Sequence, residues 1–116
     1  MFDFEKLDVY QKAKQFNKEV YAFLRNSKAI DSVSKNQLRR ASLSIMLNIA
    51  EGSSRFSKAD RRNFFVISRG SVFECVAVFD FLKDESILPE ERHAPFYQQS
   101  DELSRMLFTM IRNLQP

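Results

Sequence analysis

The chain has 116 residues, of which 44% are hydrophobic and 28% are charged, and its formal net charge is +3. This length suits a single domain, 1–116, and the composition lies outside the range typical of disordered chains. One cysteine and one histidine exclude an internal disulfide and a zinc site built from soft ligands, and two glycines with three prolines argue against a turn-rich sheet protein.

The sequence indicates no contact with a membrane. No apolar stretch approaches the ~18 residues that a spanning helix needs, and the N-terminus lacks a basic segment followed by an apolar one. The single cysteine, Cys75, fits a reducing compartment. We therefore expect a cytoplasmic protein.

The spacing of apolar residues predicts two helices in the first half of the chain. The first spans 5–25, where steps of three and four residues place Val9, Ala13, Phe16, Val20 and Phe23 on one stripe. A polar segment follows, and Asp31, Ser32 or Ser34 can cap the second helix, 34–51. Gly52 then suits a left-handed residue that ends this helix.

The second half predicts two more helices. Ser57 and Asp60 form a variant capping box for a helix over 58–84, and Pro89 suits the first turn of a helix over 90–113. Pro95 either kinks this last helix or marks the start of its regular part. Because the connections are short, we expect an all-α, antiparallel, up-down-up-down four-helix bundle.

The helix over 34–51 has two apolar faces. One, with Leu38, Ala41, Ile45 and Ile49, suits the bundle core, and the other consists of Leu43, Met46, Leu47 and Ala50. A monomeric bundle needs only one such face. We therefore expect the second to contact another subunit, although a broad core-facing surface is the alternative.

A polar strip lies between these two faces and consists of Arg40, Ser44, Asn48 and Glu51. Burying it beside the apolar faces is costly unless its groups satisfy one another. The pattern therefore predicts that Arg40 is ion-paired with Glu51 or Glu74.

In the helix over 58–84, the predicted core stripe is Phe64, Ile67, Ser71, Cys75, Val78 and Leu82. Gly70 lies beside it, at a cost of about 1 kcal/mol of helix propensity relative to alanine. We expect this glycine to allow close approach of another backbone.

Positive charge is concentrated in the middle of the chain, where eight cations face two carboxylates between Lys35 and Arg69. Lys58, Arg62 and Arg69 share one side of the third helix and, with Arg61, form a candidate phosphate-binding surface. A solvated helix face is the alternative interpretation of the same charges.

Nothing in the sequence indicates catalysis. Cys75 lies on the predicted core stripe, and His93 stands in a polar run that suits the solvated surface. Glu51 and Glu74 can converge, but no cleft is predicted between them. We expect no enzymatic activity, no metal and no cofactor.

A further pattern begins with residues 37–45, QLRRASLSI. It continues through Asn48-Ile49-Ala50-Glu51-Gly52 and Arg55 to Phe64, Gly70-Ser71 and Glu74. This pattern resembles the four-helix bundle proteins encoded in intervening sequences of bacterial 23S ribosomal RNA genes. That family is similar to the accessory variability-determinant protein of diversity-generating retroelements, a pentamer that binds nucleic acid and a reverse transcriptase. The resemblance implies a homopentamer and assigns interface or motif roles to Arg40, Ser44, Asn48, Glu51, Gly52, Arg55, Gly70, Ser71 and Glu74.

Together these features predict a non-enzymatic, oligomeric adaptor that binds RNA or DNA through a basic surface and can also engage a protein partner. The alternative is a homo-oligomeric scaffold that binds only proteins. The two differ in whether binding involves salt-sensitive contacts with phosphate.

Overall fold

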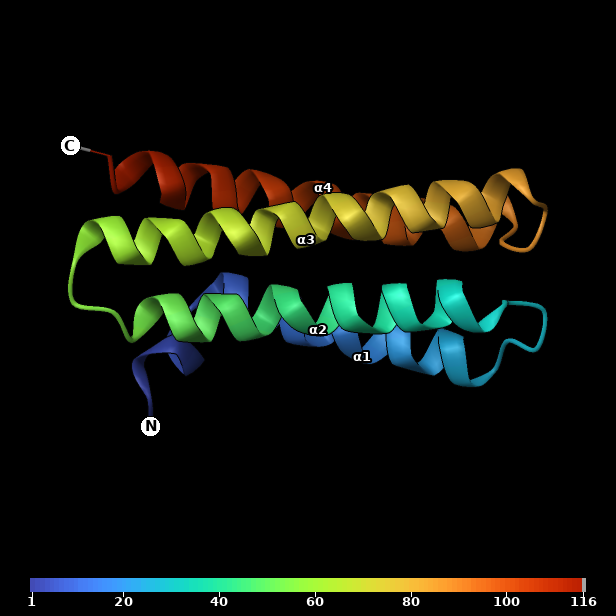
Figure 1. Ribbon diagram of the computed structural model, residues 1–116, viewed down its shortest axis with the longest axis horizontal. Helices are drawn as coiled ribbons and strands as arrows, with labels where there is room; N and C mark the ends of the chain where they lie inside the picture. The colour runs from blue at the N-terminus through green and yellow to red at the C-terminus, as the bar shows by residue number, and fades with distance from the viewer. Residues whose placement is uncertain (116) are drawn as a thin grey trace.

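The computed structural model of the chain describes residues 1–115. A short 3-10 helix, η1 (Asp3–Lys6), precedes four helices: α1 (Asp8–Arg25), α2 (Ser32–Ser53), α3 (Lys58–Asp84) and α4 (Glu90–Asn113). Successive helices run in opposite directions and are joined at alternate ends of the bundle (Figure 1). The predicted all-α, antiparallel four-helix bundle is confirmed, with extents of 44 × 26 × 22 Å.

Side-chain caps begin two of the helices. Asp31 accepts a hydrogen bond from the backbone N–H of Ser34, and hydrogen bonds from the side chain and backbone of Ser34 lower the pKa of the Asp31 carboxyl group. The Ser57 hydroxyl accepts from the backbone N–H of Asp60 at the start of α3. Pro95 lies inside α4, which already begins at Glu90, so it does not mark the start of that helix.

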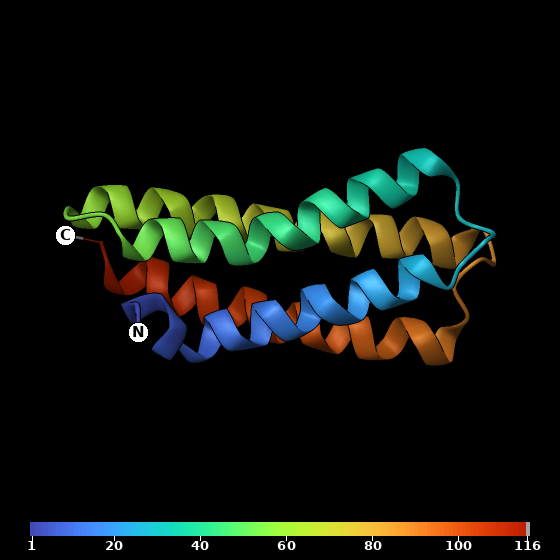
Figure 2. The ribbon, with the colours of Figure 1, turned by 90° about the horizontal axis from the view of Figure 1, so that it is seen from below.

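The core lies between all four helices, each of which packs against its two neighbours in the order α1, α2, α3, α4 (Figures 1 and 2). At its centre the ring of Phe79 stacks on that of Phe96, with centroids 4.5 Å apart. Phe16 meets both rings edge-on at 6.4 and 6.2 Å. These contacts fasten α1, α3 and α4 together across the bundle.

The predicted core stripe of α3 is mostly wrong. Its buried residues are Phe65, Ser68, Val72, Cys75, Phe79 and Leu82, so only Cys75 and Leu82 were placed correctly. Ile67 is 45% exposed, and Phe64, Ser71 and Val78 are half-buried. At about 100° per residue, the buried stripe is centred about 60° around the helix from the predicted one, and the sequence did not determine this orientation because α3 is apolar on more than one side.

Gly52 has a packing role instead of the predicted left-handed one. The described residues include no glycine with positive φ, and α2 continues through Gly52 to Ser53. A Cβ atom at this position would lie 2.8 Å from Cε1 of Phe65 and 3.0 Å from Cβ of Phe64. The absence of a side chain therefore lets the end of α2 pack closely against α3.

Candidate nucleic-acid and subunit surfaces

A cluster of cations lies where α2 passes into α3, at the end of the bundle that also holds η1 and the last turn of α4 (Figure 1). We call Arg55, Lys58, Arg61 and Arg62 the basic end. Lys58 is exposed, and the three arginines are half-buried. Arg61 is oriented by a hydrogen bond of 2.7 Å from its Nε to the carbonyl oxygen of Arg55.

Arg55 is held by two contacts. Its guanidinium group lies 4.6 Å from the centre of the Phe64 ring, and one of its nitrogens is 3.8 Å from a carboxylate oxygen of Glu51. This is a long ion pair between side chains that are each about half exposed, so it neutralises little of the local charge. Arg55 therefore contributes to the positive potential of the basic end.

The rest of the basic end is not neutralised within the chain. Within residues 1–115, no carboxylate lies within 4.0 Å of Lys58, Arg61 or Arg62. The buried Nε atoms of Arg55 and Arg62 also lack an acceptor among these residues. An unpaired buried donor is unfavourable, so these two nitrogen atoms can still donate to a partner from outside the single chain.

Arg69 does not extend the basic end as a solvated stripe. Its Nε donates to the backbone carbonyl oxygen of Ser104 at 3.1 Å. Its guanidinium group lies 4.8 Å from the centre of the Phe73 ring and 5.4 Å from that of Phe108. The side of α3 that carries Arg69 faces the seam with α4, where this arginine links the two helices.

The predicted oligomer face of α2 is only partly open to solvent. Leu47 is 52% exposed, whereas Leu43, Met46 and Ala50 are half-buried and Met46 packs against the core. Leu47 and Ala50 line a shallow hollow of ≈ 560 Å³ with Phe2 and Phe4 of the N-terminal segment. Much of this face is therefore already covered within the chain.

A larger apolar surface lies on α3 and was missed from the sequence. Val66, Ile67, Phe73 and Phe81 are each 45–55% exposed, and Gly70 lies among them. We call these five residues the outer face of α3. The predicted close approach at Gly70 is not made within the chain, since nothing lies within 4 Å of where its Cβ would be.

The polar strip of α2 meets α3 through hydroxyl and amide groups. Asn48 donates to both the backbone and side-chain oxygens of Ser44, each at 2.9 Å, and the hydroxyl groups of Ser44 and Ser71 are 2.9 Å apart. These bonds satisfy the half-buried part of the strip.

The ion pair predicted for Arg40 is not formed. Arg40 and Glu74 both line a hollow of ≈ 300 Å³ and are exposed, yet no carboxylate of residues 1–115 lies within 4.0 Å of Arg40. Glu51 is paired with Arg55 instead. Arg40 and Glu51, the charged ends of the strip, are exposed. Because water solvates both charges, Arg40 can remain without the predicted ion pair.

Neither Cys75 nor His93 is a reactive surface group. Burial raises the pKa of the Cys75 thiol to about 12, with a smaller contribution from the charge of Glu74. His93 was predicted at the surface but is buried, since it continues the core spacing of α4 through Phe96, Ser100, Leu103 and Leu107. No group of three metal-ligating side chains occurs among the described residues.

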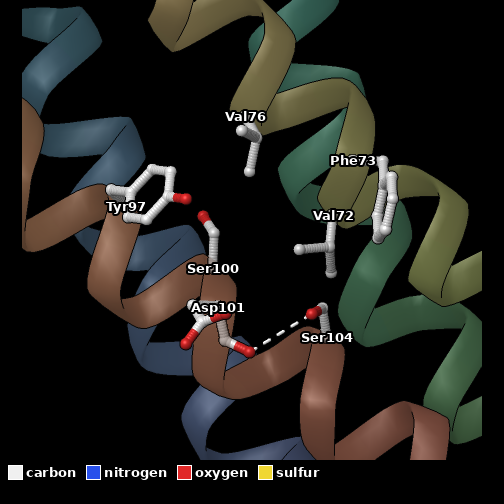
Figure 3. A pocket seen from close by; sticks show the side chains of 7 residues that line it. All are labelled: Val72, Phe73, Val76, Tyr97, Ser100, Asp101 and Ser104. Atoms are coloured by element: carbon white, nitrogen blue, oxygen red, sulfur yellow. Dashed lines mark hydrogen bonds between the residues drawn. The ribbon is translucent and has the colours of Figure 1, made fainter.

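A hollow of ≈ 230 Å³ lies between α3 and α4, lined by Val72, Phe73, Val76, Tyr97, Ser100, Asp101 and Ser104. The hydroxyl groups of Tyr97 and Ser100 point toward one another in it, and Ser104 donates to the backbone oxygen of Asp101 at 3.2 Å (Figure 3). The Ser100 hydroxyl donates to the backbone oxygen of Phe96 at 2.8 Å, and the Asp101 carboxylate pairs with Arg105 at 3.1 Å.

Within residues 1–115, no helix combines the length and the apolar character needed to cross a bilayer. No curated protein matches the chain. A crystal structure from the S23 ribosomal protein family of Bacteroides thetaiotaomicron, of a protein with unknown function, is similar in fold. Its TM-score is 0.84 at 22% identity, covering 89% of this chain and 97% of that one.

A protein family also matches most of the chain. The family described as 23S rRNA-intervening sequence protein matches residues 5–109. This range includes all of α1, α2 and α3 and most of α4. The chain therefore belongs to the 23S rRNA-intervening sequence protein family.

Proposed function

We propose that the chain is a non-enzymatic, homo-oligomeric adaptor that binds nucleic acid through its basic end. The observation that carries the proposal is the unpaired state of Lys58, Arg61 and Arg62 within residues 1–115. Cations with no carboxylate partner can each take a phosphate oxygen, and this contact is favoured by release of the counterions held around nucleic acid.

The outer face of α3 supports the oligomer. Several exposed apolar side chains on one side of a helix are typical of interaction surfaces, and Gly70 leaves room for a neighbouring backbone to come close. A second copy would bury this surface. The number of five subunits comes from the family resemblance alone.

Binding of a labelled nucleic acid, followed by fluorescence anisotropy across a salt series, tests the proposal. The logarithm of affinity should fall with the logarithm of salt, with a slope of roughly −0.7 to −0.9 for each phosphate contact. Replacing Lys58 and Arg62 with glutamine should weaken binding and flatten the slope by up to about two contacts. Arg69 is left intact because it links α3 to α4.

The matched control replaces Lys14 and Lys18, two exposed lysines of α1, with glutamine. It removes the same amount of charge from another part of the surface and should leave affinity nearly unchanged. Equal losses in both double variants would mean that only net charge matters. If the wild-type chain binds no nucleic acid at ~50 mM salt, the protein-only scaffold becomes the better account.

A further inference from the structure

The side chain of Phe56 is 99% exposed, more than any other large hydrophobic residue of the chain. It lies between the last turn of α2 and the first turn of α3, in the loop that carries the basic end. Ring atoms in this position make no packing contact that would stabilise the fold. An aromatic residue held fully in solvent at this place therefore needs another explanation.

The surroundings of Phe56 are cationic and polar. Arg55 precedes it, Ser57 and Lys58 follow it, and Arg61 and Arg62 lie in the next turn, with Asp60 as the one carboxylate between 55 and 62. Protein interfaces bury contiguous apolar patches, whereas the residues on either side of this ring in the chain are serines and cations. The setting favours an anionic ligand that also has an aromatic face.

Single-stranded nucleic acid combines these two properties. Proteins that bind it use cations for the backbone and exposed aromatic rings on which bases stack. A duplex offers the same phosphates, but the faces of its bases are already stacked on one another. The aromatic ring is thus useful only where bases are unpaired.

We propose that Phe56 stacks on an unpaired base of single-stranded nucleic acid whose phosphates contact the basic end. This inference rests on the proposed function and adds the form of nucleic acid and the residue that recognises it. It predicts that the chain binds single strands more tightly than duplex, and that the side chain of Phe56 is responsible for the difference. The cations contribute to binding of both forms.

The chain contains no tryptophan, so Phe56→Trp introduces a single fluorescent reporter at the proposed contact. A single-stranded oligonucleotide should quench this tryptophan, and the duplex of the same sequence should quench it much less. Val33→Trp is the matched control, because Val33 is an exposed apolar residue in the first turn of α2, at the other end of the bundle from Phe56 and away from the outer face of α3. Equal quenching by both forms, or at both positions, would overturn the inference.

Affinity measurements separate this inference from the proposed function. Phe56→Ala should weaken single-strand binding about fivefold to 150-fold, leave duplex binding unchanged and keep the salt slope. Phe56→Leu should lose most of the same affinity, because it keeps an apolar side chain but has no ring to stack. The fold should be unaffected in both variants, which circular dichroism can verify.

Three results would contradict the inference in different ways. If Phe56→Ala binds as tightly as the wild type while the Lys58 and Arg62 double variant binds weakly, the basic end binds phosphate but stacking is refuted. If Phe56→Leu retains full affinity, the ring makes an ordinary apolar contact. If neither single strand nor duplex binds at ~50 mM salt, the proposed function fails and the inference fails with it.

Discussion

Replacing Gly52 with alanine tests the closest contact between α2 and α3. The new Cβ would lie 2.8 Å from Cε1 of Phe65, a ring that is only 4% exposed, and 3.0 Å from Cβ of Phe64, which is fixed to the backbone of α3. Overpacking of this kind costs about 1–3 kcal/mol. Alanine regains about 1 kcal/mol of helix propensity, so a net loss of about 1 kcal/mol is expected.

Urea unfolding followed by circular dichroism measures this difference, at a protein concentration where the chain is monomeric. Gly70→Ala is the control, because nothing lies within 4 Å of its added Cβ, and it should raise the free energy of unfolding by up to about 1 kcal/mol. The two variants should therefore differ by about 2 kcal/mol. If Gly52→Ala were as stable as Gly70→Ala, the inferred close packing of α2 on α3 would be wrong.

Two further predictions concern assembly and pH. Ile67→Asp places a charge on the outer face of α3. Light scattering should therefore give the mass of several subunits for the wild-type chain and the monomer mass of 13.6 kDa for the variant. A monomeric wild-type chain would refute the oligomer. Burial raises the pKa of the Cys75 thiol from its ordinary value of 9.0 to about 12 in the folded chain. The stability that comes from this shift is therefore complete below pH 9.0 and declines as the pH rises above 9.0. Between pH 9.0 and about pH 10 the wild type should lose about 1 kcal/mol of unfolding free energy that Cys75→Ala does not lose.

The sequence predicted the helices well because their signals are local. Asp31 and Ser57 cap α2 and α3 through their own side chains, and such caps depend on residues only three positions away. Apolar spacing in α1 was equally informative, since Val9, Ala13 and Phe16 lie on a single stripe and all are buried. One apolar stripe leaves only one way to orient a helix.

The sites were predicted less well because they depend on how each helix is rotated. Ile67 and Val72 are similar in character, yet Ile67 is 45% exposed and Val72 is fully buried. The sequence does not distinguish them, because α3 is apolar on more than one side and its orientation depends on how the whole helix packs. His93 could have been placed correctly by continuing the core spacing of α4 back from Phe96 and Ser100. The spacing of apolar residues could not have predicted that Phe56 is exposed, because this residue lies in a loop and belongs to no helical pattern.

The two proposed surfaces lie on different parts of the bundle, and this has a consequence for binding. The outer face lies on α3 from Val66 to Phe81, whereas Phe56 precedes this helix and Lys58 is its first residue. A second copy on the outer face would leave the tip open, so each added subunit brings another basic end to the same assembly. Linked sites bind with an avidity that exceeds the affinity of one site. Blocking assembly should therefore weaken binding to a long strand far more than binding to a strand that spans a single basic end.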